Sequence, residues 1–166
     1  MIILGIDPGN ARCGYGVVEK TPQGIAHIAS GCIETKKNTD EAVRLLQLDT
    51  ELAHIIQIYT PDEAAIEALF YFKNPKTIIG VAQARGVCLR CLEAERVPSF
   101  SYTPLQVKQA VTAYGRAQKP QVLKMVMSIL KLKTPPKPDD AADALAIALC
   151  HAAVPDALKK AKTPRP

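Results

Sequence analysis

Apolar runs of strand length open the chain and are separated by turn residues. The first, 2–7, ends in Asp7 directly before a Pro-Gly pair. Two more apolar segments, 14–18 and 25–33, follow it, with turn residues between them. Short apolar runs bounded by turn residues are typical of β-strands. The pattern therefore predicts three consecutive antiparallel strands.

Helical spacing of apolar residues is the main pattern further along the chain. It begins at 41–59, where Asp40 can cap the helix. A short apolar segment, 64–69, is interrupted only by Glu67 and is expected to be a strand. The other expected elements are a helix from Lys76 to about Glu95, a strand at 98–102, a helix from Thr103-Pro104, a helix from Pro120 to about Leu130 and a last helix from Asp139. This order predicts one α/β domain at 1–153, with a five-stranded mixed sheet flanked by helices on both faces.

The helix expected at 76–95 is apolar on more than one face. Such a helix needs two packing partners. One would be its own sheet, and the other could be a second subunit, with Gly80 and Gly86 allowing close approach. The alternative is a helix buried inside one domain, which suits so short a chain less well.

Charge is unevenly distributed along the 166 residues, whose net charge is +5. Residues 154–166 supply +3 of this charge and contain three prolines, so we expect a disordered basic tail. Residues 96–138 carry eight basic and no acidic side chains. A segment of one sign suits the phosphates of a nucleic acid, although a solvated basic face explains the charge equally well.

The five cysteines form an odd set, and the N-terminus lacks the features of a signal peptide, so we expect a cytoplasmic protein. Cys88 and Cys91 have the spacing of a zinc or redox pair. Because no second pair or nearby histidine completes such a site, we interpret them as core thiols. No apolar stretch is long enough to predict a membrane span.

Two carboxylates stand in otherwise apolar strand segments. Asp7 would lie at the end of a central strand, although Asp-Pro-Gly by itself could be only a turn. Glu67 is the single charge in its segment, and a carboxylate in a buried strand is costly unless it is paired or binds metal. No basic partner for Glu67 is obvious, which favours a functional role.

The last helix adds three acids in its first turns. Asp139 is expected to be the N-cap. Asp140 and Asp143 are three residues apart and share one face of the helix. Because alanines surround Asp143, this surface should pack on the sheet and direct both side chains inward.

Asp7, Glu67, Asp140 and Asp143 are therefore expected to converge. Their mutual repulsion would raise each pKa unless a cation compensated. Oxygen ligands without histidine or thiolate favour Mg²⁺ or Mn²⁺. Two such ions, about 3.5 to 4 Å apart, would serve phosphodiester hydrolysis. The basic segment 96–138 leads directly to these aspartates, so the charges of site and substrate agree.

Six segments carry recognisable motifs, in chain order Ile3–Gly9, Gly14–Val17, Ala65–Glu67, Ala82–Val87, Gln106–Gln109 and Asp140–Ala146. Together they resemble the RuvC family of bacterial Holliday junction resolvases. The resemblance covers residues 2 to about 151. It implies a ribonuclease-H-like fold, a homodimer, Mg²⁺ dependence, and paired symmetric nicks across a four-way DNA junction. It also implies a branch-migration helicase complex of the RuvA and RuvB families as a partner in recombination and repair.

By this resemblance, Asp7, Glu67, Asp140 and Asp143 match the four catalytic, metal-binding acids of the family. Residues expected to contact DNA are Lys108 and Lys119 near the scissile strand, Phe70 beside the active site, and also Lys73, Arg85 and Arg116. The alternatives are that Lys108 and Lys119 are solvated helix residues and that Phe70 belongs to the core.

Other protein classes share parts of this pattern. Actin-like ATPases and sugar kinases have a similar strand and Asp-Gly turn, but they need two such domains, and the chain has no Walker A motif. A ribonuclease H would share the fold and metals and would cut an RNA-DNA hybrid. A non-catalytic junction-binding module would lack one of the four acids, and all four are present.

Overall fold

The computed structural model describes residues 1–9, 11–36, 38–69 and 75–155, without the side chains of 75–77. Phe70, Lys73 and residues 156–166 of the basic tail lie outside the described residues. The elements, in chain order, are β1 (Ile2–Asp7), β2 (Arg12–Thr21), β3 (Gly24–Glu34), α1 (Glu41–Tyr59), β4 (Glu63–Glu67), α2 (Pro75–Ala94), β5 (Ser99–Tyr102), α3 (Pro104–Thr112), α4 (Lys119–Ile129) and α5 (Asp139–Ala153).

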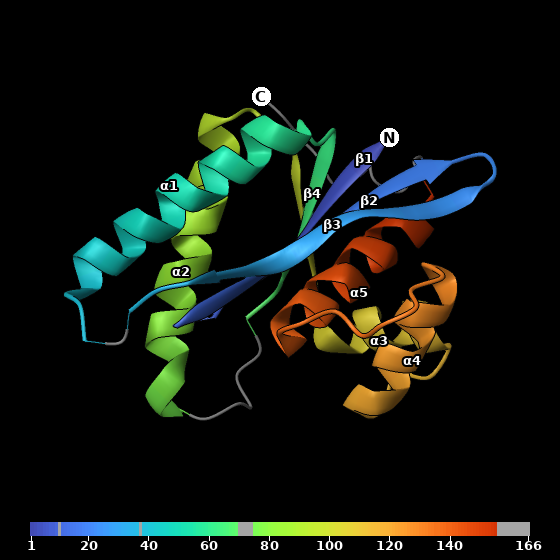
Figure 1. Cartoon of the computed structure of the whole chain (residues 1–166). Helices are drawn as coiled ribbons and strands as arrows, with labels where there is room; N and C mark the ends of the chain where they lie inside the picture. The colour runs from blue at the N-terminus through green and yellow to red at the C-terminus, as the bar shows by residue number, and fades with distance from the viewer. Residues whose placement is uncertain (10, 37, 70–74, 156–166) are drawn as a thin grey trace.

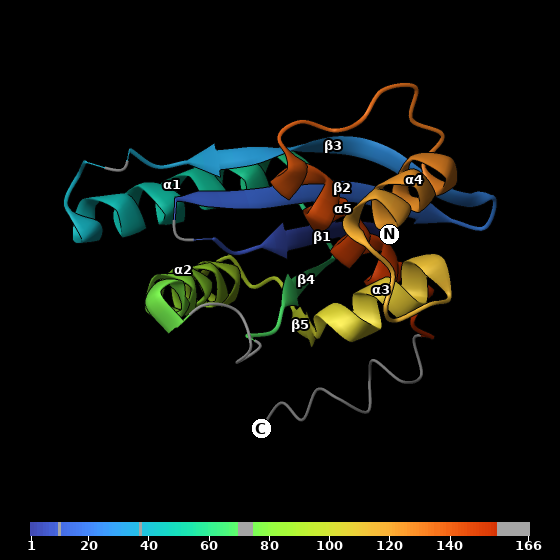
Figure 2. The ribbon, with the colours of Figure 1, turned by 90° about the horizontal axis from the view of Figure 1, so that it is seen from below.

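The strands form one mixed sheet in the order β3-β2-β1-β4-β5. The first three strands are joined by short turns and pair antiparallel, as predicted. β4 lies parallel to β1, and β5 lies parallel to β4, each after a helical connection. Parallel neighbours require such crossovers, which place helices on the faces of the sheet. Figure 2 shows this order along the sheet.

Helices cover both faces of the sheet, and each face has its own core. α1 and α2 lie on one side, whereas α5 lies on the other with α3 and α4 outside it (Figure 1). Alternate residues of β1 enter the two cores: Leu4 and Ile6 pack with α1 and α2, and Ile3 packs with α5. This alternation follows from the two-residue period of a strand.

The central helix α5 packs closely on β1 and β2 because glycines leave room for its backbone. A Cβ atom at Gly5 would overlap the carbonyl oxygen of Ala144, and one at Gly14 would overlap the carbonyl oxygen of Asp140. Alanines dominate the buried residues of α5. The small residues on both elements therefore bring the start of α5 directly against β2.

A buried polar network fixes the other end of α5. His151 is fully buried, with Nδ1 2.7 Å from the hydroxyl of Tyr102 and Nε2 2.7 Å from the Glu63 carboxylate. Its ring also lies against Phe100. These contacts join α5 to β4 and β5, so the helix is held at both ends relative to the strands that carry the acids.

Most elements agree with the sequence predictions, and one assignment was wrong. Asp40 caps α1 by accepting a hydrogen bond from the Ala42 amide, as expected. Asp139, however, is the first helical residue of α5 and not its N-cap. The extended backbone that defines the cap position lies at Pro138, and no side chain caps this end. Asp139 instead places a negative charge in the first turn of the helix, where it favours the helix dipole.

The second apolar side of α2 packs against α1, a partner that the sequence pattern did not identify. Cys88 and Cys91 are buried there, which confirms them as core thiols. None of the five cysteines forms a disulfide. No helix in the described part of the chain is long and apolar enough to cross a membrane.

Candidate active site

Asp7 and Glu67 lie at the carboxyl ends of two neighbouring parallel strands. Ile6 of β1 pairs with Ile66 of β4, and each acid is the next residue. Because side chains alternate along a strand, both acids project toward the α5 face, whereas both isoleucines enter the opposite core. The two carboxylates are therefore adjacent through strand register alone.

The first turns of α5 bring Asp140 and Asp143 to the same place. Asp7 of β1 pairs with Gly14 of the neighbouring strand β2, and the backbone of Asp140 packs against Gly14. All four acids line one cleft of about 390 Å³ together with Lys108 and Lys119. The structure thus brings together acids from both ends of the chain, Asp7 near the N-terminus and Asp140 and Asp143 in the last helix.

Asp7 is buried close to the other three acids. Burial, followed by repulsion from Glu67, Asp143 and Asp140, raises the pKa of Asp7 from 3.8 to about 7. In the absence of a cation, this carboxyl group is therefore partly protonated near neutral pH. A divalent cation beside it would favour the ionised form.

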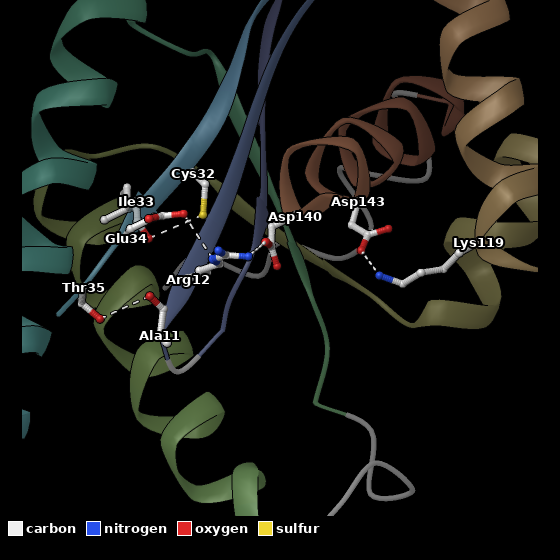
Figure 3. A network of polar contacts seen from close by, with 9 residues as sticks. All are labelled: Ala11, Arg12, Cys32, Ile33, Glu34, Thr35, Lys119, Asp140 and Asp143. Carbon is white, nitrogen blue, oxygen red and sulfur yellow. Dashed lines mark hydrogen bonds and ion pairs between the residues drawn. The ribbon is translucent and has the colours of Figure 1, made fainter. Parts of the chain in front are cut away.

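Two basic side chains approach the acids from opposite sides (Figure 3). Lys119 Nζ donates to Asp143 Oδ2 at 2.7 Å, and this bond is the main cause of the raised pKa of Lys119. Arg12 Nη1 lies 3.9 Å from Asp140 Oδ2, while its Nε lies 3.2 Å from Glu34 Oε1. Lys119 was identified from the sequence, whereas Arg12 was not. The available signal was the position of Arg12, two residues before Gly14 on the strand that pairs with the strand of Asp7.

The acidic cluster fits a hard divalent cation chemically. Its ligands are carboxylate oxygens, and the raised pKa of Asp7 reflects an excess of negative charge that a cation would relieve. Within the described ranges, no three acidic, histidine or cysteine side chains are arranged so that they could hold one ion. Metal binding would therefore require the carboxylates to turn toward a common point.

The other expected DNA contacts lie in different environments. Lys108 on α3 is half-buried in the cleft. Arg116 is exposed in the turn between α3 and α4. Arg85 lies on α2 and donates from Nε to the Glu67 carbonyl at 3.0 Å and from Nη2 to Ser101 Oγ at 2.7 Å. Arg85 thus joins the ends of β4 and β5, and its contact with DNA stays a prediction.

Comparison with known proteins identifies the family. The family model described as crossover junction endodeoxyribonuclease RuvC matches residues 3–151. The chain belongs to the RuvC family. It is 53% identical over 151 residues to crossover junction endodeoxyribonuclease RuvC of Petrotoga mobilis, covering 91% of this chain and 93% of that relative.

Solved structures of RuvC have the same fold. The Thermus thermophilus RuvC structure matches with a TM-score of 0.85 and 33% identity, covering 92% of this chain and 94% of that one. T. thermophilus RuvC in complex with Holliday junction substrate matches with a TM-score of 0.85 and 34% identity, covering 92% and 93%. These matches confirm the predicted ribonuclease-H-like α/β fold and the resemblance stated from the sequence motifs.

Proposed function

We propose that this protein resolves four-way DNA junctions in homologous recombination and DNA repair by hydrolysing one phosphodiester bond in each of two symmetry-related strands. The observation that carries the proposal is the cleft in which Asp7, Glu67, Asp140 and Asp143 meet, in a chain of the crossover junction endodeoxyribonuclease family. A relative from T. thermophilus has been solved in complex with Holliday junction substrate, which supports the choice of substrate.

We assign the four carboxylates as ligands of two Mg²⁺ ions, with Mn²⁺ as a possible substitute. When bound, such ions stabilise the attacking and leaving oxygens and make the attacking water more acidic. The protein contributes the arrangement of the ligands: two on adjacent strand ends and two on one turn of a closely packed helix. Lys119 already neutralises part of this charge through Asp143.

The basic segment 96–138 provides one side of the expected DNA-binding surface. It contains β5, α3, α4 and their connections, and the two helices lie beside the cleft and contribute Lys108 and Lys119 to it. Arg116 extends this surface at the turn between the two helices. Phosphate contacts of this kind position the backbone without reading sequence. Arg85, Phe70 and Lys73 complete the set of residues that we assign to DNA.

We further propose that the protein acts as a homodimer, with one cleft on each of the two strands that are cut. A two-fold protein matches the two symmetry-related strands of a junction. The branch-migration complex of the RuvA and RuvB families is the proposed partner. Five cysteines without a disulfide suit a reducing compartment, so we assign the protein to the cytoplasm.

A comparison of three substrates tests the proposal. The protein is incubated with a synthetic four-way junction, a linear duplex of the same sequence and an RNA-DNA hybrid, each with Mg²⁺ and with a chelator. We expect paired nicks in the junction only, and only with Mg²⁺. Preferential cutting of the hybrid would indicate a ribonuclease H instead, and cutting in the presence of the chelator would exclude the metal assignment.

A further inference from the structure

Arg12 stands at the edge of the carboxylate cluster on the side away from α3 and α4. It begins β2, and Figure 3 shows its guanidinium group reaching Asp140 while Lys119 reaches Asp143 from the other side. The basic side chains that line the cleft itself, Lys108 and Lys119, both come from the α3 and α4 side. Arg12 is therefore a basic residue placed across the cluster from them.

The position of Arg12 is defined by its cross-strand neighbour. Arg12 and Glu34 are paired in the register of β2 and β3, and the Arg12 Nε lies 3.2 Å from Glu34 Oε1. Of the two terminal nitrogens, Nη1 is the one that lies 3.9 Å from Asp140. Glu34 thus directs the terminal nitrogens toward the acidic cluster.

Folding stability does not explain this arrangement. The side chains of Arg12 and Asp140 are 55% and 31% exposed, and their separation is near the upper limit of an ion pair. Such exposed pairs contribute little to stability. The guanidinium group also retains donors beyond these two contacts, because arginine has five N–H groups.

The expected position of the scissile phosphate indicates what Arg12 could bind. If Asp140 binds a metal at the scissile phosphate, as in the proposed function on which this inference rests, that phosphate must lie beside Asp140. Because Arg12 Nη1 lies 3.9 Å from Asp140 Oδ2, a phosphate bound beside Asp140 would be within reach of Arg12. We propose that Arg12 contacts the DNA backbone from the β2 side of the active site, opposite Lys108 and Lys119.

Salt-dependent binding to a fluorescent four-way junction tests this inference. All proteins carry Asp7→Asn, so that binding in Mg²⁺ is measured without cleavage. Arg12→Ala should weaken binding several-fold and lower the slope of log affinity against log salt by about 0.9, the value for one phosphate contact. Arg12→Lys should keep the slope. Lys119→Ala is the comparison on the opposite side and should lower the slope by a similar amount.

Arg90→Ala is the matched control. Arg90 also forms an exposed ion pair with an aspartate, with Nη2 2.6 Å from Asp49 Oδ2, but it joins α2 to α1 on the other face of the sheet. This variant should leave the slope unchanged. An equal drop in Arg90→Ala and Arg12→Ala would show a general charge effect and overturn the inference.

The Mg²⁺ requirement for cleavage tests the remaining alternative, in which Arg12 only competes with the metal at Asp140. With Asp7 intact, the half-saturating Mg²⁺ concentration is measured for wild type and Arg12→Ala. An unchanged salt slope overturns the inference, and a lower Mg²⁺ requirement in that case shows that Arg12 only competes with metal at Asp140. If wild type fails to cut the junction at all, the proposed function fails; if it cuts and only the slope is unchanged, the inference about Arg12 fails alone.

Discussion

At the scale of single residues, the candidate active site holds four carboxylates in one cleft. Asp7 is placed among three other acids, and both burial and repulsion oppose its ionised form. Lys119 and Arg12 reduce this repulsion at Asp143 and Asp140, respectively. Asp7, whose pKa is raised by both effects, is therefore an informative residue to change.

Asp7→Asn should abolish junction cleavage and preserve junction binding. The substitution removes a proposed metal ligand but leaves Lys108 and Lys119, which we propose to contact phosphate. Binding should be equal or somewhat tighter, because one negative charge facing DNA is lost. Cleavage is measured with a labelled junction and binding by fluorescence anisotropy. Cutting at the wild-type rate would remove Asp7 from the site.

The metal-free protein should lose stability as pH rises from about 4 to about 7. In this range the folded state keeps the proton on Asp7, whose pKa is raised from 3.8 to about 7, while the unfolded chain has released it. The loss should be on the order of 2 kcal/mol after solvent screening. Urea denaturation with a chelator at several pH values measures it.

Asp7→Asn is the control for this pH dependence and should remove it. Mg²⁺ should also reduce it, because a cation favours the ionised carboxylate. The same pH profile in wild type and in Asp7→Asn would mean that other groups cause the loss.

At the scale of elements, close packing of α5 on the sheet decides where the acids meet. Asp7 and Glu67 are fixed by strand register, but Asp140 and Asp143 reach them only because β2 presents Gly14 to the helix backbone. The network around His151 holds the far end of α5 on β4 and β5. The close packing of α5 on the strands is thus what brings the four acids of the candidate site into one cleft.

Gly14→Ala should move the start of α5 away from β2, since the added methyl group would overlap the Asp140 carbonyl. We expect a destabilisation of about 1 to 3 kcal/mol, typical of overpacking, and a large loss of cleavage in the variant that remains folded. Gly86→Ala on α2 is the control, because nothing lies within 4 Å of a Cβ there. It should be neutral or slightly stabilising through helix propensity. Equal effects at both positions would contradict the packing argument.

At the scale of the whole molecule, the surface of α2 bears on subunit assembly. The two apolar sides of this helix are largely covered by the sheet and by α1. Leu89 packs against that core, whereas Ile79 is 69% exposed. Ile79 therefore marks the outward side of α2, a direction that periodicity alone does not fix.

Ile79→Glu should therefore give a folded monomer if α2 forms the dimer interface. In a two-fold contact, each substitution lies near its own copy and adds repulsion to the lost burial. The monomer should nick junctions without pairing the two cuts. Leu89→Glu is the contrasting variant and should destabilise the fold itself. Sedimentation of wild type at micromolar concentration decides the matter: a monomer, both free and on junction DNA, would exclude this interface.

The sequence by itself determined the elements and the candidate acids. Apolar periodicity depends on local spacing, so it predicted the three-stranded start, the helices and the five-stranded mixed sheet. A charge in an apolar strand is costly wherever the strand packs, so Glu67 was conspicuous before any contact was known. The family motifs added the ribonuclease-H-like fold and the expected substrate.

Only the tertiary structure decided which distant side chains meet. Three contacts join residues that are far apart in the chain. They are the ion pair of Arg12 with Asp140, the hydrogen bond from Arg85 to the Glu67 carbonyl and the packing of α1 on α2. Local patterns carry no information about such pairs, because helix period and strand alternation give the direction of a side chain but not its neighbour. The cap of α5 fell one residue earlier than predicted because Pro138, and not Asp139, takes the extended backbone. The two basic sides of the acidic cluster are thus a property of the folded chain.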